Sequence, residues 1–394
     1  MAGLEEKLCP VCFQEAMEHG ECRNCGYHAE ESSAVKDYLA PFTILKEKYL
    51  LGKSLGQGGF GITYLAENMQ SGLRCCIKEY FPSGLLQGRT PDGALILADE
   101  ENRPEYEEGK QQFIEEACAL QELRENISVV DILDFFEENG TAYFAMELIE
   151  GCNLRVFRKN HNPKQTLKMA LQMLFLLGSS LAEVHRFGMI HGDISPENIL
   201  ITQDGEIKLI DFGAARSFRQ GSDNKERKIY LKPNYAPYEQ YTQKPCQGPW
   251  TDIYALAATF YFIVSGRKML DALSRAKGAS YPPLHELCPA VSRQLSDVID
   301  KALAFDYHDR YRRMLDFLDA LEQVVRPEDY DIDLGALMPK SKASKQAEIH
   351  VETSDDSEKM CQVEEQNMPE PKRLAAFFHP KKRRLAYRQR LRQS

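Results

Sequence analysis

The sequence predicts an α+β protein in which a small cysteine-rich module precedes two lobes, one built on a sheet and one on helices. Two CxxC pairs lie within residues 1–30, and residues 31–48 look like a short connector. Residues 49–326 show continuous apolar periodicity, strand-rich first and helix-rich later. A five-stranded antiparallel sheet with one helix, followed by a mainly helical lobe, would leave a cleft between the two lobes.

Five β-type runs are expected in the first lobe, separated by glycine-containing or polar turns: Tyr49–Leu55, Ile62–Glu67, Leu73–Glu79, Val129–Glu137 and Thr141–Leu148. The last two runs flank Glu138-Asn139-Gly140, which is a strong hairpin signal. Between the third and fourth runs we expect a helix over about Tyr106–Leu123, because Phe113, Ala117 and Leu120 recur at helical spacing.

The second lobe is expected to be helical, with these segments: Thr166–Phe187, Thr251–Val264, Val291–Ala304 and Met314–Val325. Gly188 follows the first of them as a C′ glycine. The longest apolar run, Met169–Leu177, is shorter than the ~20 residues that span a bilayer, so we interpret it as a buried helix.

The composition narrows the possible environment and partners. The net charge of −10 does not suggest a nucleic-acid-binding protein as a whole. The first residues lack the apolar stretch of a secretory signal. Seven of the 11 cysteines are scattered rather than arranged as a disulfide framework, which favours a reducing, cytoplasmic location.

The other four cysteines predict a zinc ribbon over residues 1–30. Cys9, Cys12, Cys22 and Cys25 form two CxxC pairs with nine residues between them, a spacing that suits one tetrahedral Zn²⁺. So short a segment cannot build its own core, and structural zinc supplies about 10–16 kcal/mol of apparent binding free energy. A redox dithiol is the alternative. The sequence does not choose among three roles for the ribbon: docking, nucleic-acid contact, or folding alone.

A glycine-rich turn and a lysine predict a phosphate site. The sequence Leu55-Gly56-Gln57-Gly58-Gly59-Phe60-Gly61 lies between two expected strands, which favours a strand-turn-strand flap over a dinucleotide site. Lys78 ends the next buried strand, where a lysine either extends to water or pairs with a carboxylate. Glu116 flanks the apolar stripe of the expected helix and is our choice, with Glu115 as the rival.

Two further motifs supply carboxylates and an amide. His191-Gly192-Asp193-Ile194-Ser195-Pro196-Glu197-Asn198 places an Asp and an Asn five residues apart, and Asp211-Phe212-Gly213 follows. Phosphoryl transfer from a nucleotide requires such a set, with one carboxylate to orient the attacking hydroxyl and two oxygen ligands for Mg²⁺.

In this order, the glycine-rich turn, Lys78, Glu116 and these two motifs resemble the eukaryotic-type (Hanks-type) serine/threonine protein kinases, in their bacterial branch. The resemblance covers about residues 49–326 and continues through Ala236-Pro237-Tyr238-Glu239, Asp252 and Arg310. It implies the two-lobed protein-kinase fold and ATP-dependent phosphorylation of a protein hydroxyl, with Mg²⁺, or Mn²⁺ as an alternative. Ser195-Pro196-Glu197 matches the Ser/Thr pattern rather than the Tyr pattern.

The resemblance also implies residue roles. Asp193 would orient the substrate hydroxyl, Asn198 and Asp211 would ligate Mg²⁺, and Lys78 would hold the phosphates. Backbone groups of Glu147 and Ile149, just after the gatekeeper Met146, would bond the adenine edge. The ring would lie between Leu55, Thr63, Cys76 and Leu200, beneath Gly56, Gly58 and Gly61.

Two departures from the family pattern concern activity and control. Gly192 replaces an arginine that normally meets a phosphate, and Asp211–Glu239 contains only Ser217 and Ser222 besides tyrosines. We therefore expect activity without phosphorylation of that segment. Ser195 replaces a lysine that steadies the transferring phosphate, and our hypothesis is that Lys232 supplies the missing cation. The alternative is a solvated loop lysine.

Residues 327–394 form an acidic-then-basic tail that we expect to be mostly disordered. The basic part begins at Lys372 and suits an acidic partner, nucleic acid or an anionic membrane surface, or folds back on the protein. A pseudokinase or nucleotide-binding scaffold is the main rival function, and a nucleic-acid adaptor is the second. Retention of Lys78, Asp193, Asn198 and Asp211 favours an active enzyme.

Overall fold

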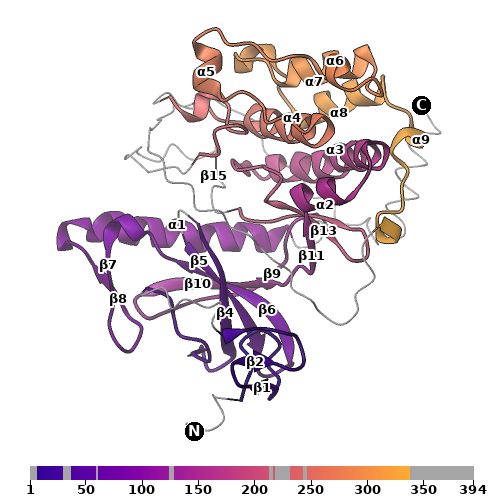
Figure 1. Ribbon diagram of the computed structural model, residues 1–394. Coiled ribbons are helices and arrows are strands. Elements are labelled where there is room, and N and C mark those ends of the chain that lie inside the picture. The colour runs from indigo at the N-terminus through magenta and orange to yellow at the C-terminus, as the bar shows by residue number, and fades with distance from the viewer. Residues whose placement is uncertain are drawn as a thin grey trace.

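The computed structural model describes residues 7–29, 37–58, 61–123, 128–212, 216–217, 231–242 and 246–337. A sheet-rich N-terminal lobe and a helical C-terminal lobe lie one above the other, with a short cysteine-rich module against the sheet (Figure 1). The expected two-lobed α+β architecture is therefore confirmed. Of the expected segments, connector residues 31–36 and tail residues 338–394 lie outside the described part of the chain.

The N-lobe sheet contains the five expected strands and one more. Its strands are β3 (Ile44–Leu45), β4 (Tyr49–Gly58), β5 (Gly61–Asn68), β6 (Leu73–Tyr80), β9 (Ile132–Glu138) and β10 (Thr141–Glu147). They are antiparallel neighbours in the order β3-β4-β5-β6-β10-β9. The additional strand, β3, comes from residues expected to be a connector. Its Leu45 is buried in the core, which accounts for its place on the sheet edge.

The two faces of this sheet bury different side chains, as the two-residue period of a strand requires. Phe144 packs on Phe113 of α1 (Arg103–Glu122), which crosses one face (Figure 1). Tyr64, Ile77 and Tyr143 belong to a second core on the opposite face. The helix begins at Arg103, earlier than expected, because a 3-10 turn and a proline in the first turn extend it.

A hairpin that we did not predict follows β6. It consists of β7 (Leu86–Arg89) and β8 (Leu95–Leu97) and packs partly on the second core. Arg89 forms a buried ion pair with Glu79 (2.5 Å), and Glu79 also accepts hydrogen bonds from two tyrosine hydroxyls at 2.9 Å. A buried carboxylate needs such partners, so the hairpin neutralises a charge inside the lobe.

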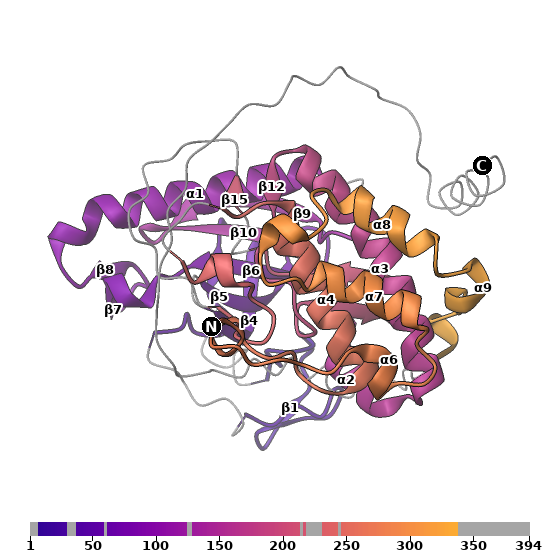
Figure 2. The ribbon, with the colours of Figure 1, turned by 90° about the horizontal axis from the view of Figure 1, so that it is seen from above.

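The C-lobe is built around two long helices, α3 (Pro163–Arg186) and α4 (Pro249–Ser265), which pack side by side (Figure 2). Shorter helices surround them: α2 (Leu154–Asn160), α5 (Ala272–Ala276), α6 (Leu284–Leu287), α7 (Arg293–Ala302), α8 (Met314–Glu322) and α9 (Pro327–Tyr330). The four expected helices are thus present. Gly188 follows α3 with a φ of 77°, the left-handed conformation expected of a C′ glycine.

By length and composition alone α3 could cross a membrane, but 67% of its most apolar window is buried inside the lobe. It is therefore the core helix that the sequence predicts.

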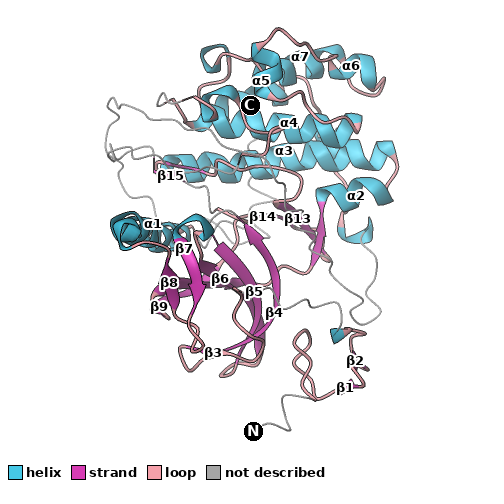
Figure 3. Ribbon diagram, turned by 60° about the vertical axis from the view of Figure 1, so that its left-hand side comes forward, coloured by secondary structure: helices cyan, strands magenta, loops and turns pink. Residues whose placement is uncertain are grey.

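Short strands line the side of the C-lobe that faces the sheet (Figure 3). The strands β11 (Gly151–Asn153), β13 (Ile199–Thr202) and β14 (Ile207–Leu209) form one small sheet, and β12 (Met189–Ile190) pairs with β15 (Arg216–Ser217). The loops between these strands carry the predicted catalytic motifs. The fold therefore sets those motifs opposite the N-lobe sheet.

The folded lobe continues past residue 326, where we expected the tail to begin. The Tyr330 ring stacks on Phe175 of α3 at 4.6 Å, and Leu334 is only 2% exposed. The carbonyl of Leu337 lies 3.1 Å from His161 Nε2. Apolar side chains in the first residues of the expected tail therefore add a last layer to the C-lobe.

Candidate active site

The sheet side of the candidate site is defined by strand register. Lys78 on β6 stands opposite Thr63 and Phe144, and Cys76 stands opposite Met146. Residues paired in this way point to the same face, so Thr63, Cys76, Lys78 and Met146 share the face that packs on α1 and looks toward the C-lobe. Burial raises the pKa of the Cys76 thiol to about 12, so this residue is a neutral wall of the pocket.

The remaining predicted adenine contacts come from both lobes. Leu200, on β13, is buried, and Leu55, on β4, is half-buried. Glu147 ends β10, and its side chain accepts a bond from Lys208 Nζ at 2.7 Å. Ile149 follows in the segment that joins the lobes. Within the glycine-rich turn, Gly59 and Phe60 lie outside the described residues.

Lys78 is paired with the aspartate of the second motif. Its Nζ lies 2.6 Å from Asp211 Oδ1. Burial alone would lower the pKa of Lys78, but the carboxylates of Asp211 and Glu116 outweigh burial and raise it. In return, the Lys78 ammonium holds the pKa of Asp211 far below its ordinary value. Both groups are therefore charged at neutral pH.

The surroundings of the two glutamates of α1 favour Glu116 as the partner of Lys78. Glu116 is half-buried, and its charge acts on Lys78. Glu115 is exposed and accepts a bond from Gln111 one helical turn away. Lys78 bonds directly to Asp211, and the charge of Glu116 also acts on Lys78.

The catalytic loop between β12 and β13 is held by hydrogen bonds within itself. Asn198 Nδ2 donates to the backbone carbonyl and to Oδ2 of Asp193, both at 2.8 Å. The buried His191 ring packs on Phe212 with centroids 4.4 Å apart, which ties the two motifs together. Asp211 has a φ of 62°, a strained conformation for a residue other than glycine and one that clusters at functional sites.

Asp252 of α4 fixes the backbone of this loop from below. Its carboxylate accepts from the amides of His191 (2.8 Å) and Gly192 (2.9 Å) and contacts His185 Nε2 at 2.8 Å. Burial would raise the pKa of Asp252, but these partners lower it below its ordinary value. Gly192 has a φ of 76°, a conformation that glycine adopts without strain.

Lys232 reaches the same loop from far along the chain. Its Nζ lies 2.9 Å from Ser195 Oγ and 2.9 Å from Asp193 Oδ2. Ser195 is fully buried, and the Lys232 side chain is 34% exposed. Burial raises the pKa of Asp193 despite the opposing charge of Lys232. The ammonium group therefore contacts the loop that carries Asp193 and Ser195, although its side chain remains partly exposed to solvent.

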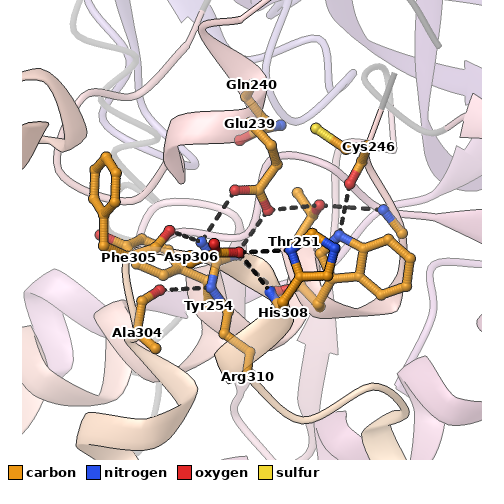
Figure 4. A network of polar contacts seen from close by, with 12 residues as sticks. Glu239, Gln240, Cys246, Thr251, Tyr254, Ala304, Phe305, Asp306, His308 and Arg310 are labelled. Carbon is orange, nitrogen blue, oxygen red and sulfur yellow. Dashed lines mark hydrogen bonds and ion pairs between the residues drawn. The ribbon is translucent and has the colours of Figure 1, made fainter. Parts of the chain in front are cut away.

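A buried network anchors the segment that carries Lys232 (Figure 4). Arg310 forms a bidentate pair with Glu239, at 2.7 and 3.0 Å, and these side chains are 0% and 2% exposed. Thr251 Oγ1 also donates to Glu239 at 3.1 Å. Gln240 donates to the carbonyl of Gly192 at 2.8 Å, a link for which the sequence carries no signal. The network thus connects α4, the segment and the catalytic loop.

The four N-terminal cysteines converge on one point. Their Sγ atoms all lie within 4.8 Å of one another, with Cys9 to Cys25 and Cys12 to Cys22 at 3.6 Å. A tetrahedral ion with Zn–S bonds of about 2.3 Å requires S···S separations of about 3.8 Å. A disulfide requires about 2.05 Å. The donor set therefore fits a structural zinc ion.

The two lobes, with Lys78, Asp193, Asn198 and Asp211 between them, are typical of a phosphotransferase. Comparison with known proteins gives the family. Residues 49–319 match the family model for the protein kinase domain, so this chain belongs to the protein kinase family. This range contains most of both lobes and the motifs around Lys78, Asp193 and Asp211.

Similar proteins include bacterial kinases. The chain is 31% identical over 286 residues to serine/threonine-protein kinase F of Synechocystis sp., covering 68% of this chain and 53% of that protein. It is 29% identical over 289 residues to serine/threonine-protein kinase PknA of Nostoc sp., covering 71% of this chain and 48% of that protein. The chain thus spans about half the length of these curated relatives.

A solved structure supports the same conclusion. The apo form of PpkA-294 has a TM-score of 0.60 and 32% sequence identity, and the match covers 73% of this chain and all of that one. The fold and the family are therefore shown by both sequence and structure.

Proposed function

We propose that this protein is an ATP-dependent serine/threonine protein kinase that transfers the γ-phosphate of ATP to a protein hydroxyl. The observation that carries the proposal is the convergence of two bonded pairs, Lys78 with Asp211 at 2.6 Å and Asn198 with Asp193 at 2.8 Å. The pairs lie close enough for the charge of Asp211 to act on Asp193. The names of the Synechocystis and Nostoc relatives support the Ser/Thr class.

The residues in the cleft suit ATP and Mg²⁺. Because Asn198 donates through Nδ2 to Asp193, its Oδ1 keeps the lone pairs that a hard cation prefers. Asp211 is charged, and its side chain remains 45% exposed in the cleft despite its bond to Lys78. These two groups would hold Mg²⁺, or Mn²⁺, which neutralises phosphate charge when bound. Lys78 would hold the phosphates, with Glu116 as its positioning charge.

Asp193 has the contacts of a general base. Its Oδ2 accepts from Asn198 (2.8 Å) and Lys232 (2.9 Å), which leaves Oδ1 to accept the proton of the substrate hydroxyl. We assign to Lys232 the stabilisation of negative charge that develops on the transferred phosphoryl group. Ser195 then positions the ammonium through its hydroxyl at 2.9 Å.

We also propose that activity does not require phosphorylation of the segment Asp211–Glu239. The Gly192 backbone is already held by Asp252 and Gln240, so the loop does not depend on an arginine–phosphate contact. Ser222 lies outside the described residues, and Ser217 is described only through its backbone pairing with Met189. Phosphatase treatment should therefore leave activity unchanged. Activity that disappears and returns with phosphorylation of the segment would refute this.

Zinc is proposed as a structural ion held by Cys9, Cys12, Cys22 and Cys25. None of the cysteines among the described residues forms a disulfide, which supports a reducing, cytosolic location. The basic tail, with its expected acidic partner or anionic surface, lies outside the described residues and stays a prediction.

Incubation with Mg²⁺ and labelled ATP tests the main proposal, with the wild type beside Asp193→Asn. Asp204→Asn is the matched control, since Asp204 is an exposed residue of the β13–β14 turn. Label should appear on a Ser or Thr residue of a protein substrate in the wild type and the control, but not with Asp193→Asn. Nucleotide binding without transfer in all three would instead support the pseudokinase. Equal labelling by all three would show that Asp193 is not required.

A further inference from the structure

The cysteine-rich module sits directly on the strand that leads into the glycine-rich turn. Lys53 N, in β4, donates to the carbonyl oxygen of Pro10 at 2.9 Å. A Cβ added to the neighbouring Gly52 would lie 2.2 Å from that oxygen and 2.8 Å from Cζ of Phe13. Residue 52 must therefore be glycine for this contact to form, because any side chain would displace the module.

The contact falls on an irregularity of β4. Leu51 stands opposite Ala66, but Ser54 stands opposite Tyr64, so β4 holds an extra residue at this point. A bulge of this kind leaves a backbone group outside the strand ladder. Here the Lys53 amide is directed to Pro10 instead of to a neighbouring strand. The module therefore supplies a hydrogen-bond acceptor for the Lys53 amide and fixes the backbone conformation of the bulge.

The position of the Pro10 carbonyl depends on the metal site. Pro10 lies inside the first CxxC pair, and Val11 N donates to Cys9 Sγ at 3.4 Å. The small core of the module consists largely of Cys9, Cys22 and Cys25 with Tyr27. With so few apolar side chains, the metal–thiolate bonds supply most of the folding free energy of such a module. Loss of the ion would thus release the contact with β4.

The same strand, β4, also carries residues of the proposed nucleotide site. After Lys53, β4 continues through Leu55, Gly56 and Gly58. Leu55 is two residues beyond the contact, a rise of about 7 Å along the strand. A second register shift, between Ser54 and Gly56, lies in this short stretch. A backbone displacement at the bulge would therefore also displace the glycine-rich turn, because little regular strand lies between them.

We propose that the module is a metal-dependent brace for the glycine-rich turn, so that metal occupancy raises the affinity of the cleft for nucleotide. This inference rests on the proposed function, because it takes the cleft as the ATP site. By linkage, bound nucleotide must raise the affinity of the module for the metal by the same factor. The brace would let metal occupancy regulate nucleotide affinity from the N-lobe. Regulation through a phosphate at residue 192 is not available, because Gly192 has no side chain to bind one.

The test uses the full chain and measures two quantities, the zinc content and the Kd for a fluorescent ATP analogue. Removal of zinc by a chelator should weaken nucleotide binding by at least about fivefold, the lower end of usual coupling between sites. Gly52→Ala should weaken it similarly while zinc is retained, because it displaces the module without touching a cysteine. Gly84→Ala is the matched control, since a Cβ there meets nothing within 4 Å.

A second measurement needs no variant. The affinity of the wild type for zinc, measured by equilibrium competition with a chelator, should rise at least about fivefold when the nucleotide is saturating. An unchanged affinity for zinc, or a Gly52→Ala protein that keeps its zinc and binds nucleotide like the wild type, would overturn the brace and leave the kinase proposal standing. A wild type that holds zinc but binds no nucleotide would overturn both.

Discussion

Replacement of Lys232 by alanine should lower kcat by about 10²-fold and change the KM for ATP little. The ammonium lies 2.9 Å from both Asp193 Oδ2 and Ser195 Oγ. Two unit charges about 4 Å apart interact by about 4 kcal/mol at an effective dielectric constant of 20. The Lys232 side chain is 34% exposed, so solvent screening reduces this figure to about 3 kcal/mol. Each 1.36 kcal/mol is about tenfold in rate.

Steady-state kinetics at saturating ATP and protein substrate measures the effect. Lys277→Ala is the control, since Lys277 is an exposed lysine of the same lobe. The decisive variant exchanges the two chemistries: Ser195→Lys combined with Lys232→Thr should recover part of the activity that Lys232→Thr loses. Thermal unfolding of each variant shows whether the protein is folded. An unchanged kcat in a folded Lys232→Ala protein would refute the role that we assign to the lysine.

Two further predictions concern stability. Arg310→Met should destabilise the protein by about 3–5 kcal/mol in urea unfolding, because it leaves the buried Glu239 carboxylate unpaired. The double variant with Glu239→Gln should lose less, and an equal loss would contradict this argument. Asp252 has a lowered pKa in the folded state, so its contribution is fully present above its ordinary value of about 3.9 and is lost as the pH falls through the lower folded value. Asp252→Asn should therefore lower Tm at pH 7 and flatten the acid side of the Tm–pH curve, whereas parallel curves would show that this carboxylate does not contribute.

Elements with a local signal were predictable. The turn Glu138-Asn139-Gly140 and the glycine-rich turn define hairpins by themselves, and α3 carries a long apolar pattern with Gly188 at its end. β3 was missed because two residues give no period. The β7–β8 hairpin was missed because it is tied to the lobe by long-range contacts, such as the pair of Arg89 with the buried Glu79 on another strand.

By itself, the order of motifs along the chain determined the family, and it predicted Lys78, Asp193, Asn198 and Asp211 as site residues, because each of these groups is marked by its immediate neighbours. The family pattern suggested Lys232 as the cation for Ser195, but only the tertiary structure brings the two side chains, 37 residues apart, to within 2.9 Å of each other. The tertiary structure also shows that the cysteine-rich module packs on Gly52. Contacts of this kind depend on how separate elements pack, and packing leaves no periodic trace in the residues that make them.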